Sequence, residues 1–179
     1  DAGRTSAEVV KSLYAAILEA AGDALILGCN TIGHLGAGLM HLSRIGDDTS
    51  GISWERTRKM GINTLAFRLC QHRTFFDVDA DCLGVTGKIP WAQNRQWAEL
   101  LAQSGPPFLA SIKPGILSAA EFEEVKRYFA MASRQEVIAE PLDWMTNTNP
   151  QKWSFDSRER EFCWSVCDGS GGNPDFTVF

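Results

Sequence analysis

The chain has 179 residues, which is enough for one complete hydrophobic core or for one domain and part of a second. Its composition, 44% hydrophobic and 22% charged, is that of a globular protein rather than a disordered or fibrous one. A net charge of −5 without Lys/Arg runs predicts no nucleic-acid partner. No apolar run reaches the roughly 18 residues that cross a bilayer, so no membrane partner is expected.

The predicted elements begin with a helix followed by two strands. Thr5-Ser6-Ala7-Glu8 has the form of a capping box, and apolar residues then recur at helical spacing as far as Gly22. The wholly apolar residues 24–29 predict a parallel strand that is buried on both faces. A glycine-rich loop at residues 33–38 leads to the next predicted strand, at residues 39–44.

The middle of the chain continues the alternation of helix and strand. Residues 54–60 have a helical pattern, while residues 63–68 fit a helix or a strand, and one continued helix over residues 54–70 is favoured. Residues 74–76 begin a strand that ends in the aspartates of residues 77–81. Residues 84–90 are rich in turn formers, and a clear helix is predicted at residues 91–104.

A further strand and helix follow. Residues 108–112 predict the strand, and Ser118-Ala119-Ala120-Glu121 is a second capping box that begins a helix ending near Ser133. Alternation of strands and helices at this spacing is typical of βα units and a parallel sheet.

The pattern changes beyond Pro141, where short strands follow one another. Antiparallel strands are expected at residues 153–155 and 161–166, with a last short strand at residues 176–179. We therefore divide the chain into residues 1–140, in βα units, and residues 141–179, the start of a β-domain.

The number of strands limits the fold. About four strands precede Pro141, whereas a complete (β/α) barrel has eight strands and about 250 residues. A doubly wound sheet is the alternative, but it requires helices over both sheet faces and a cofactor loop. The predicted fold class is α/β, namely the C-terminal half of a (β/α)8 TIM barrel followed by part of an antiparallel β-domain.

No cofactor or metal is expected. The glycine-rich residues 33–38 and 169–172 have neither the dinucleotide nor the phosphate-loop pattern. The alternating aspartates of residues 77–81 lack the glycine and glutamate of a calcium loop, and the three histidines share no metal-ligand spacing.

The cysteines and the first residues bear on location. Five cysteines are spread without disulfide or zinc spacing: Cys29, Cys70, Cys82, Cys163 and Cys167. Reduced structural thiols are expected, which favours a cytoplasmic location. The start, Asp1-Ala2-Gly3-Arg4, has neither Met nor a signal-peptide pattern, so a processed or partial chain is predicted, with an upstream signal peptide left open.

Carboxylates at strand ends point to the chemistry. Ser43-Arg44-Ile45-Gly46-Asp47-Asp48 closes an apolar stretch, and a second aspartate cluster closes the next predicted strand. Barrels of this class build sugar-cleaving sites from such carboxylates. Taken alone, the Asp47-Asp48 pair also fits a helix cap.

Three motifs in order resemble those of the melibiase-type α-galactosidase clan of glycoside hydrolases. They are Gly28-Cys29-Asn30-Thr31, the Arg44 to Asp48 segment followed by Trp54, and Asp79-Ala80-Asp81-Cys82-Leu83. The clan has Cys-Gly-x-Pro-x-Gly on strand five, Arg-x-x-x-Asp on strand six and Asn-Asp-Pro-Asp-Cys/Met-Leu on strand seven. This chain lacks the proline of the first motif and the Asn and Pro of the third.

The resemblance implies roles for individual residues. Asp48 matches the general acid/base of a retaining glycosidase, and Arg44 matches the residue that binds the sugar or orients the catalytic carboxylates. The clan's nucleophile lies on strand four, in a motif that this chain does not contain. The nucleophile is therefore expected on an upstream segment, and this chain alone is expected to be inactive.

Other residues are implied to shape the sugar pocket. Cys29 matches a residue that lines it, Asp79 and Asp81 match positions that support it, and Trp54 is expected to form a wall, because aromatic faces stack on sugars. The implied partner is a carbohydrate substrate.

Two further expectations follow from the half barrel. Its two free sheet edges and apolar face predict self-association of the isolated chain. The alternative function is a non-catalytic carbohydrate-binding or scaffold module that keeps the barrel scaffold without the nucleophile.

Overall fold

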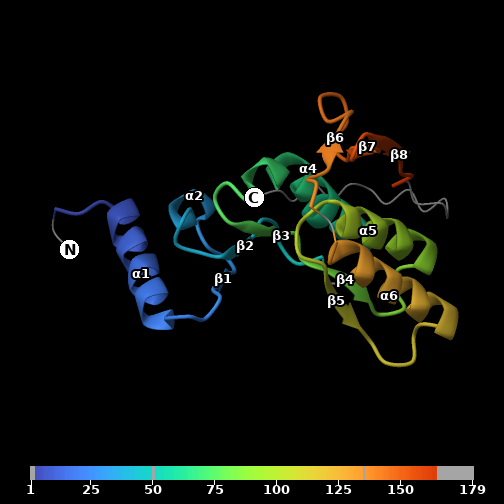
Figure 1. Cartoon of the computed structure of the whole chain (residues 1–179), viewed down its shortest axis with the longest axis horizontal. Helices are drawn as coiled ribbons and strands as arrows, with labels where there is room; N and C mark the ends of the chain where they lie inside the picture. Colours follow the sequence, from blue (N-terminus) through green and yellow to red (C-terminus); the bar gives the residue numbers. More distant parts are fainter. Residues whose placement is uncertain (1–2, 50, 135, 165–179) are drawn as a thin grey trace.

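The computed structural model describes residues 3–49, 51–134 and 136–164. It is elongated, with α1 (Ser6–Ala21) at one end and the pair α5 (Trp91–Gln103) and α6 (Ala119–Ala132) at the other (Figure 1). No helix among the described residues is long and apolar enough to cross a membrane.

The first helix forms where its capping box predicts it. The Thr5 side chain accepts a hydrogen bond from the Glu8 backbone, and the Glu8 carboxylate accepts one from the Thr5 N–H at 2.7 Å. Gly22, at φ +56°, ends the helix. Tyr14 is the buried residue of α1, and its hydroxyl accepts from the Ile32 N–H at 3.0 Å. Most of the apolar side of α1 therefore stays exposed.

Three short parallel strands follow in chain order: β1 (Leu27–Gly28), β2 (Leu42–Arg44) and β3 (Asp77–Asp79). The short helix α2 (Gly33–Gly36) lies between β1 and β2. In register, Gly28 pairs with Ser43, and Ser43 pairs with Val78.

The first predicted strand is shorter and more exposed than expected. Residues 24–29 were expected to form a strand buried on both faces, but the strand there is β1 alone, and Leu25 is 76% exposed. β1 lies at the edge of its sheet, so its apolar side chains lack the cover that a central strand receives. The prediction of parallel pairing is confirmed.

The continued helix predicted at residues 54–70 is present, with a changing hydrogen-bond pattern. α3 (Trp54–Arg56) passes into a π-helical segment, η1 (Thr57–Asn63), then into α4 (Thr64–Arg68) and a 3₁₀ turn, η2 (Leu69–Gln71). Such π segments are often found at functional sites.

A second parallel pair, β4 (Cys82–Val85) and β5 (Leu109–Ile112), continues the order of strands. Only Ala80 and Asp81 separate β3 from β4, and Asp81 has φ +67°, which turns the chain from one sheet into the next. The sequence did not predict β4, because Gly84 was assigned to the turn that follows. Within the described residues, the parallel sheets do not close into a barrel.

The C-terminal described segment is antiparallel, as predicted. It comprises β6 (Glu140–Pro141), β7 (Lys152–Phe155) and β8 (Arg158–Glu161). β8 precedes the strand expected at residues 161–166 and shares only Glu161 with it, so residues 162–164 are not in a strand as expected. Residues 165–166 and the expected strand at residues 176–179 lie outside the described residues.

One buried cluster joins the parallel and antiparallel parts. Leu83 of β4 and Trp97 of α5 are buried in it together with Trp153 of β7. The indole N–H of Trp54 donates to the Trp164 carbonyl at 3.1 Å, which ties α3 to the C-terminal segment. The division at residue 140 stays a prediction, since the two parts share this core.

Candidate active site

Two neighbouring strands place their last residues side by side. Arg44 ends β2, Asp79 ends β3, and the two are paired in register. Because the carboxyl ends of parallel strands meet at one edge of a sheet, the segments that follow, residues 45–49 and residues 80–81, adjoin there. We refer to residues 45–49 as the Asp48 loop.

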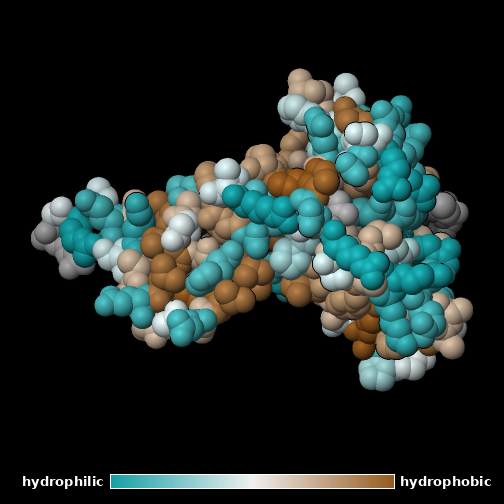
Figure 2. Space-filling view, viewed as in Figure 1, coloured by the Kyte–Doolittle hydropathy of each residue, from teal (hydrophilic) through white to brown (hydrophobic). Residues whose placement is uncertain are grey.

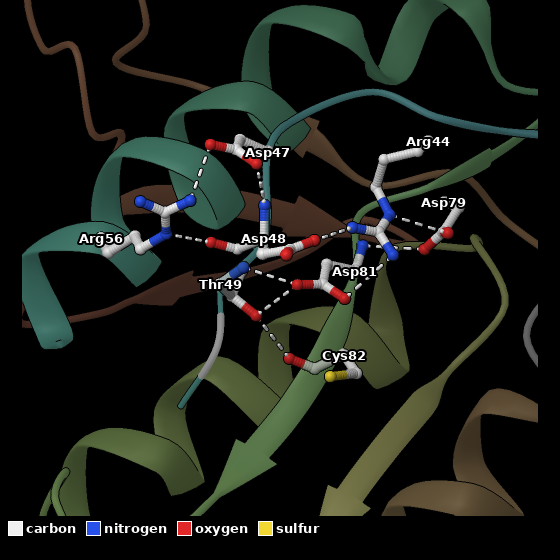
Figure 3. A network of polar contacts seen from close by, with 8 residues as sticks. All are labelled: Arg44, Asp47, Asp48, Thr49, Arg56, Asp79, Asp81 and Cys82. Carbon is white, nitrogen blue, oxygen red and sulfur yellow. Dashed lines mark hydrogen bonds and ion pairs between the residues drawn. The ribbon is translucent and has the colours of Figure 1, made fainter. Parts of the chain in front are cut away.

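Arg44 contacts three carboxylates at this edge (Figure 3). Its Nε donates to Asp79 Oδ2 at 2.9 Å, and its Nη1 donates to Asp48 Oδ1 at 3.0 Å. Its Nη2 lies 3.2 Å from Asp81 Oδ1. We call these four residues the carboxylate network. The planar guanidinium suits this task because its N–H groups point in fixed directions.

The charge of Arg44 is secured by its partners. Burial alone lowers the pKa of a guanidinium, but the hydrogen bond and charge of Asp79, with the charge of Asp81, more than offset it. The net pKa of Arg44 is therefore raised, and the side chain stays a cation among the carboxylates.

Asp79 and Asp81 are buried members of the network. Asp79 Oδ1 accepts from the Asp81 N–H at 2.8 Å. Asp81 Oδ2 accepts from the Thr49 N–H at 2.5 Å and from the Thr49 hydroxyl at 2.9 Å. These contacts occupy the carboxylate oxygens of both residues with protein donors, and their role in supporting a sugar pocket stays a prediction.

Asp48 differs from its neighbours in exposure. Its side chain is 69% exposed, whereas that of Asp79 is 1% exposed. Within the carboxylate network, Asp48 is the acid with a carboxylate open to a ligand. Its backbone N–H donates to Asp47 Oδ1 at 2.8 Å.

Cys82 directly follows Asp81 of the carboxylate network in the chain. Burial raises the pKa of its thiol to about 11, and the negative charges of Asp81 and Asp79 act in the same direction. The thiol is therefore protonated at neutral pH and is a poor nucleophile.

Cys29 and Trp54 have different positions from the other predicted site residues. Cys29 is exposed and directly follows β1, where Gly28 pairs with Ser43, so it lies level with Arg44 along the sheet. Trp54 is only 7% exposed and packs against Trp164. A ring this buried offers no face to a sugar, so in this structure Trp54 belongs to the core and forms no pocket wall.

Two residues of the site were missed by the sequence analysis. Thr49 donates to Asp81 twice, and Arg56 contacts the Asp48 loop from α3. Arg56 contacts the Asp48 main-chain carbonyl and the Asp47 side chain, and neither contact follows from a motif in the sequence. Thr49 directly follows Asp48 but lies just outside the Arg44 to Asp48 motif, so the sequence analysis did not single it out.

The described residues contain no group of three or more His, Cys, Asp and Glu side chains suited to holding a metal ion. The centre of the carboxylate network is filled by the Arg44 guanidinium. No protein-family model matches the chain, and no curated protein matches it.

Proposed function

We propose that this chain is the C-terminal half of the (β/α) barrel of a retaining α-glycosidase, similar to the melibiase-type α-galactosidase clan, followed by the start of a β-domain. Asp48 is the general acid/base. The observation that carries the proposal is the carboxylate network, in which Asp48 alone is widely exposed at the carboxyl end of adjacent parallel strands.

The chemistry needs one more carboxylate. In a retaining glycosidase the acid/base protonates the leaving oxygen and later activates water, while a nucleophile about 5 Å away forms the glycosyl intermediate. In this proposal the nucleophile comes from an upstream segment. A general acid also needs water excluded around it, which the substrate and the other half of the barrel supply to the exposed Asp48.

Arg44 has two tasks in this proposal. Its guanidinium gives two hydrogen bonds and one ion pair to aspartates, and because a guanidinium has five N–H donors, a remaining donor is proposed to bind a sugar hydroxyl. Because the same guanidinium binds Asp48, it also holds the acid/base beside the sugar.

The strand order and the exposed surface support the half barrel. The parallel strands follow one another in chain order, β1 is an edge strand, and helices separate most of them. Figure 2 shows hydrophobic residues gathered over the side formed by α1 and β1. In a complete barrel this side is covered by further βα units.

We also propose a cytoplasmic location. The support is that Cys29 and Cys70 are exposed and form no disulfide, which suits a reducing compartment.

The test measures whether Asp48 acts as the acid/base. It uses the protein expressed from the complete reading frame that encodes this chain. Asp48→Ala is expected to lower kcat/KM for an unactivated α-galactoside by about 100-fold to 10,000-fold. Activity on an aryl α-galactoside with a good leaving group is expected to survive better, because that oxygen needs no proton. Azide is expected to restore turnover and to give the α-glycosyl azide.

The control variant is Asp23→Ala, an exposed aspartate in the turn after α1, which is expected to keep full activity. Unchanged activity of Asp48→Ala, or a glycosyl azide of inverted configuration, contradicts the proposal. Binding of galactose without any hydrolysis by the wild-type protein supports the non-catalytic module instead.

A further inference from the structure

We propose that Arg56 is a positioning residue for Asp48, which it holds through the main chain of the Asp48 loop. The inference rests on the proposed function, in which Asp48 is the acid/base. Sequence motifs do not mark Arg56, and it belongs to α3 rather than to a strand end.

Arg56 and Asp47 hold both sides of the Asp48 backbone (Figure 3). Arg56 Nε donates to the Asp48 carbonyl oxygen at 2.5 Å, and Arg56 Nη2 pairs with Asp47 Oδ2 at 2.6 Å. Asp47 Oδ1 in turn accepts from the Asp48 N–H at 2.8 Å. The N–H and the carbonyl of Asp48 are thus tied to one guanidinium.

The helix that carries Arg56 is itself fixed to the core. Ser53 caps it by accepting from the Arg56 N–H, and Trp54 is buried against Trp164. Arg56 therefore connects the Asp48 loop to a packed part of the molecule, although its own side chain is partly exposed.

The start of the Asp48 loop is held as well. Arg68 Nη1 donates to the Ile45 carbonyl at 2.9 Å. A side-chain carbon at Gly46 would overlap the Met60 carbonyl oxygen in the π-helical segment, so only glycine fits this close approach. Of these contacts, the one from Arg56 is nearest to the reacting group.

An exposed acid needs such a support. Arg44 orients the Asp48 carboxylate, but the side chain also follows its backbone, and a misplacement of about 1 Å costs on the order of 100-fold in rate. A lysine at position 56 has one compact ammonium and cannot present two donors in the fixed geometry of Arg56.

The test compares Arg56→Gln and Arg56→Lys with Arg95→Gln in the product of the complete reading frame. Arg95 is a matched control, because it makes a two-point contact with Glu124, at 2.7 Å and 2.8 Å, on the outer helices. Both Arg56 variants are expected to lower kcat about tenfold or more with KM unchanged. The loss is expected to be larger for α-galactosides with poor leaving groups, which depend on the acid.

Hydrogen exchange of the Asp48 amide, measured on the same proteins, is expected to be faster in the Arg56 variants than in Arg95→Gln. Equal losses on good and poor leaving groups, or exchange no faster than in the control, overturn the positioning role. Should Arg56→Gln not fold, Asp47→Ala removes from the loop side both the partner of Arg56 Nη2 and the acceptor of the Asp48 N–H, and it is judged by the same two readouts. A wild-type protein without glycosidase activity overturns the proposed function, whereas the amide exchange still decides whether Arg56 holds the loop.

Discussion

At the scale of single residues, Arg44 decides whether the buried acids are tolerated. Asp79 is 1% exposed, and a carboxylate removed from water needs a partner charge in good geometry. Arg44 provides this through its Nε, while its Nη groups reach Asp48 and Asp81. The same cation therefore serves both the stability of the strand ends and the orientation of the exposed acid.

We expect Arg44→Gln to lower the free energy of unfolding of the chain by about 3 to 5 kcal/mol, because it leaves Asp79 charged and unpaired in the interior. Urea unfolding followed by tryptophan fluorescence measures this. The double variant Arg44→Gln/Asp79→Asn is expected to recover part of the loss, since the charge of Asp79 is removed and only the buried Asp81 keeps a charge without its cation. A loss under 1 kcal/mol in the single variant, or additive losses in the double variant, contradicts this account.

At the scale of elements, His72 links the end of η2 to β3. Its Nδ1 accepts from the Val78 N–H at 3.2 Å, so the histidine supports this strand in its neutral form. Burial lowers the pKa of His72 below its ordinary 6.5, and the charge of Arg73 adds to this, while Asp77 and the Gly105 carbonyl oppose it.

The stability of the chain is therefore expected to depend on pH through His72. In the unfolded chain this histidine takes up a proton as the pH falls through about 6.5, whereas the folded chain resists until a lower pH. The free energy of unfolding is greatest above that pH, declines below it, and levels off once the pH is under the folded pKa. Urea unfolding between pH 8 and 5 measures the decline.

The variant His72→Asn keeps an acceptor for the Val78 N–H but cannot titrate, so the decline is expected to shrink. His34 is exposed, and His34→Asn serves as the matched control, with the wild-type dependence retained. The interpretation fails when both variants show the same pH dependence as the wild-type chain.

Elements governed by local signals were predictable from the sequence, and those governed by tertiary cover were not. The capping boxes at Thr5 and Ser118 depend on residues within one turn, and both helices begin where these predict. The exposure of β1 depends on what lies beside it in space, which the apolar run at residues 24–29 does not encode. Trp54 was assigned to a sugar site, yet its large apolar surface is satisfied in the core.

The site shows the same distinction. Arg44, Asp48, Asp79 and Asp81 come together because strand order and register bring motif residues to one edge. Arg56 reaches the site through the Asp48 carbonyl, a group that every residue type carries, and through Asp47, nine residues earlier, a separation that matches no helical or strand pairing.

At the scale of the whole molecule, one side carries apolar surface with little cover in the described residues. Val9, Leu13 and Ile17 recur at helical spacing on α1 and are all exposed. Leu27 of the edge strand β1, and Leu25 just before it, are exposed as well. A free strand edge beside exposed apolar side chains favours pairing with another chain.

The isolated chain is therefore expected to self-associate through α1 and β1. Sedimentation velocity at micromolar concentration should show species heavier than the monomer, and Leu13→Glu should shift them toward the monomer by placing a charge in the contact. Met145→Glu is the matched control, because Met145 is equally apolar and 75% exposed but lies on the loop between β6 and β7. A monomeric wild-type chain contradicts the expectation. A contact at α1 and β1 makes the association more sensitive to a charge at position 13 than to one at position 145. If both variants dissociate the chain equally, this contact is contradicted, and the association comes from apolar exposure in general.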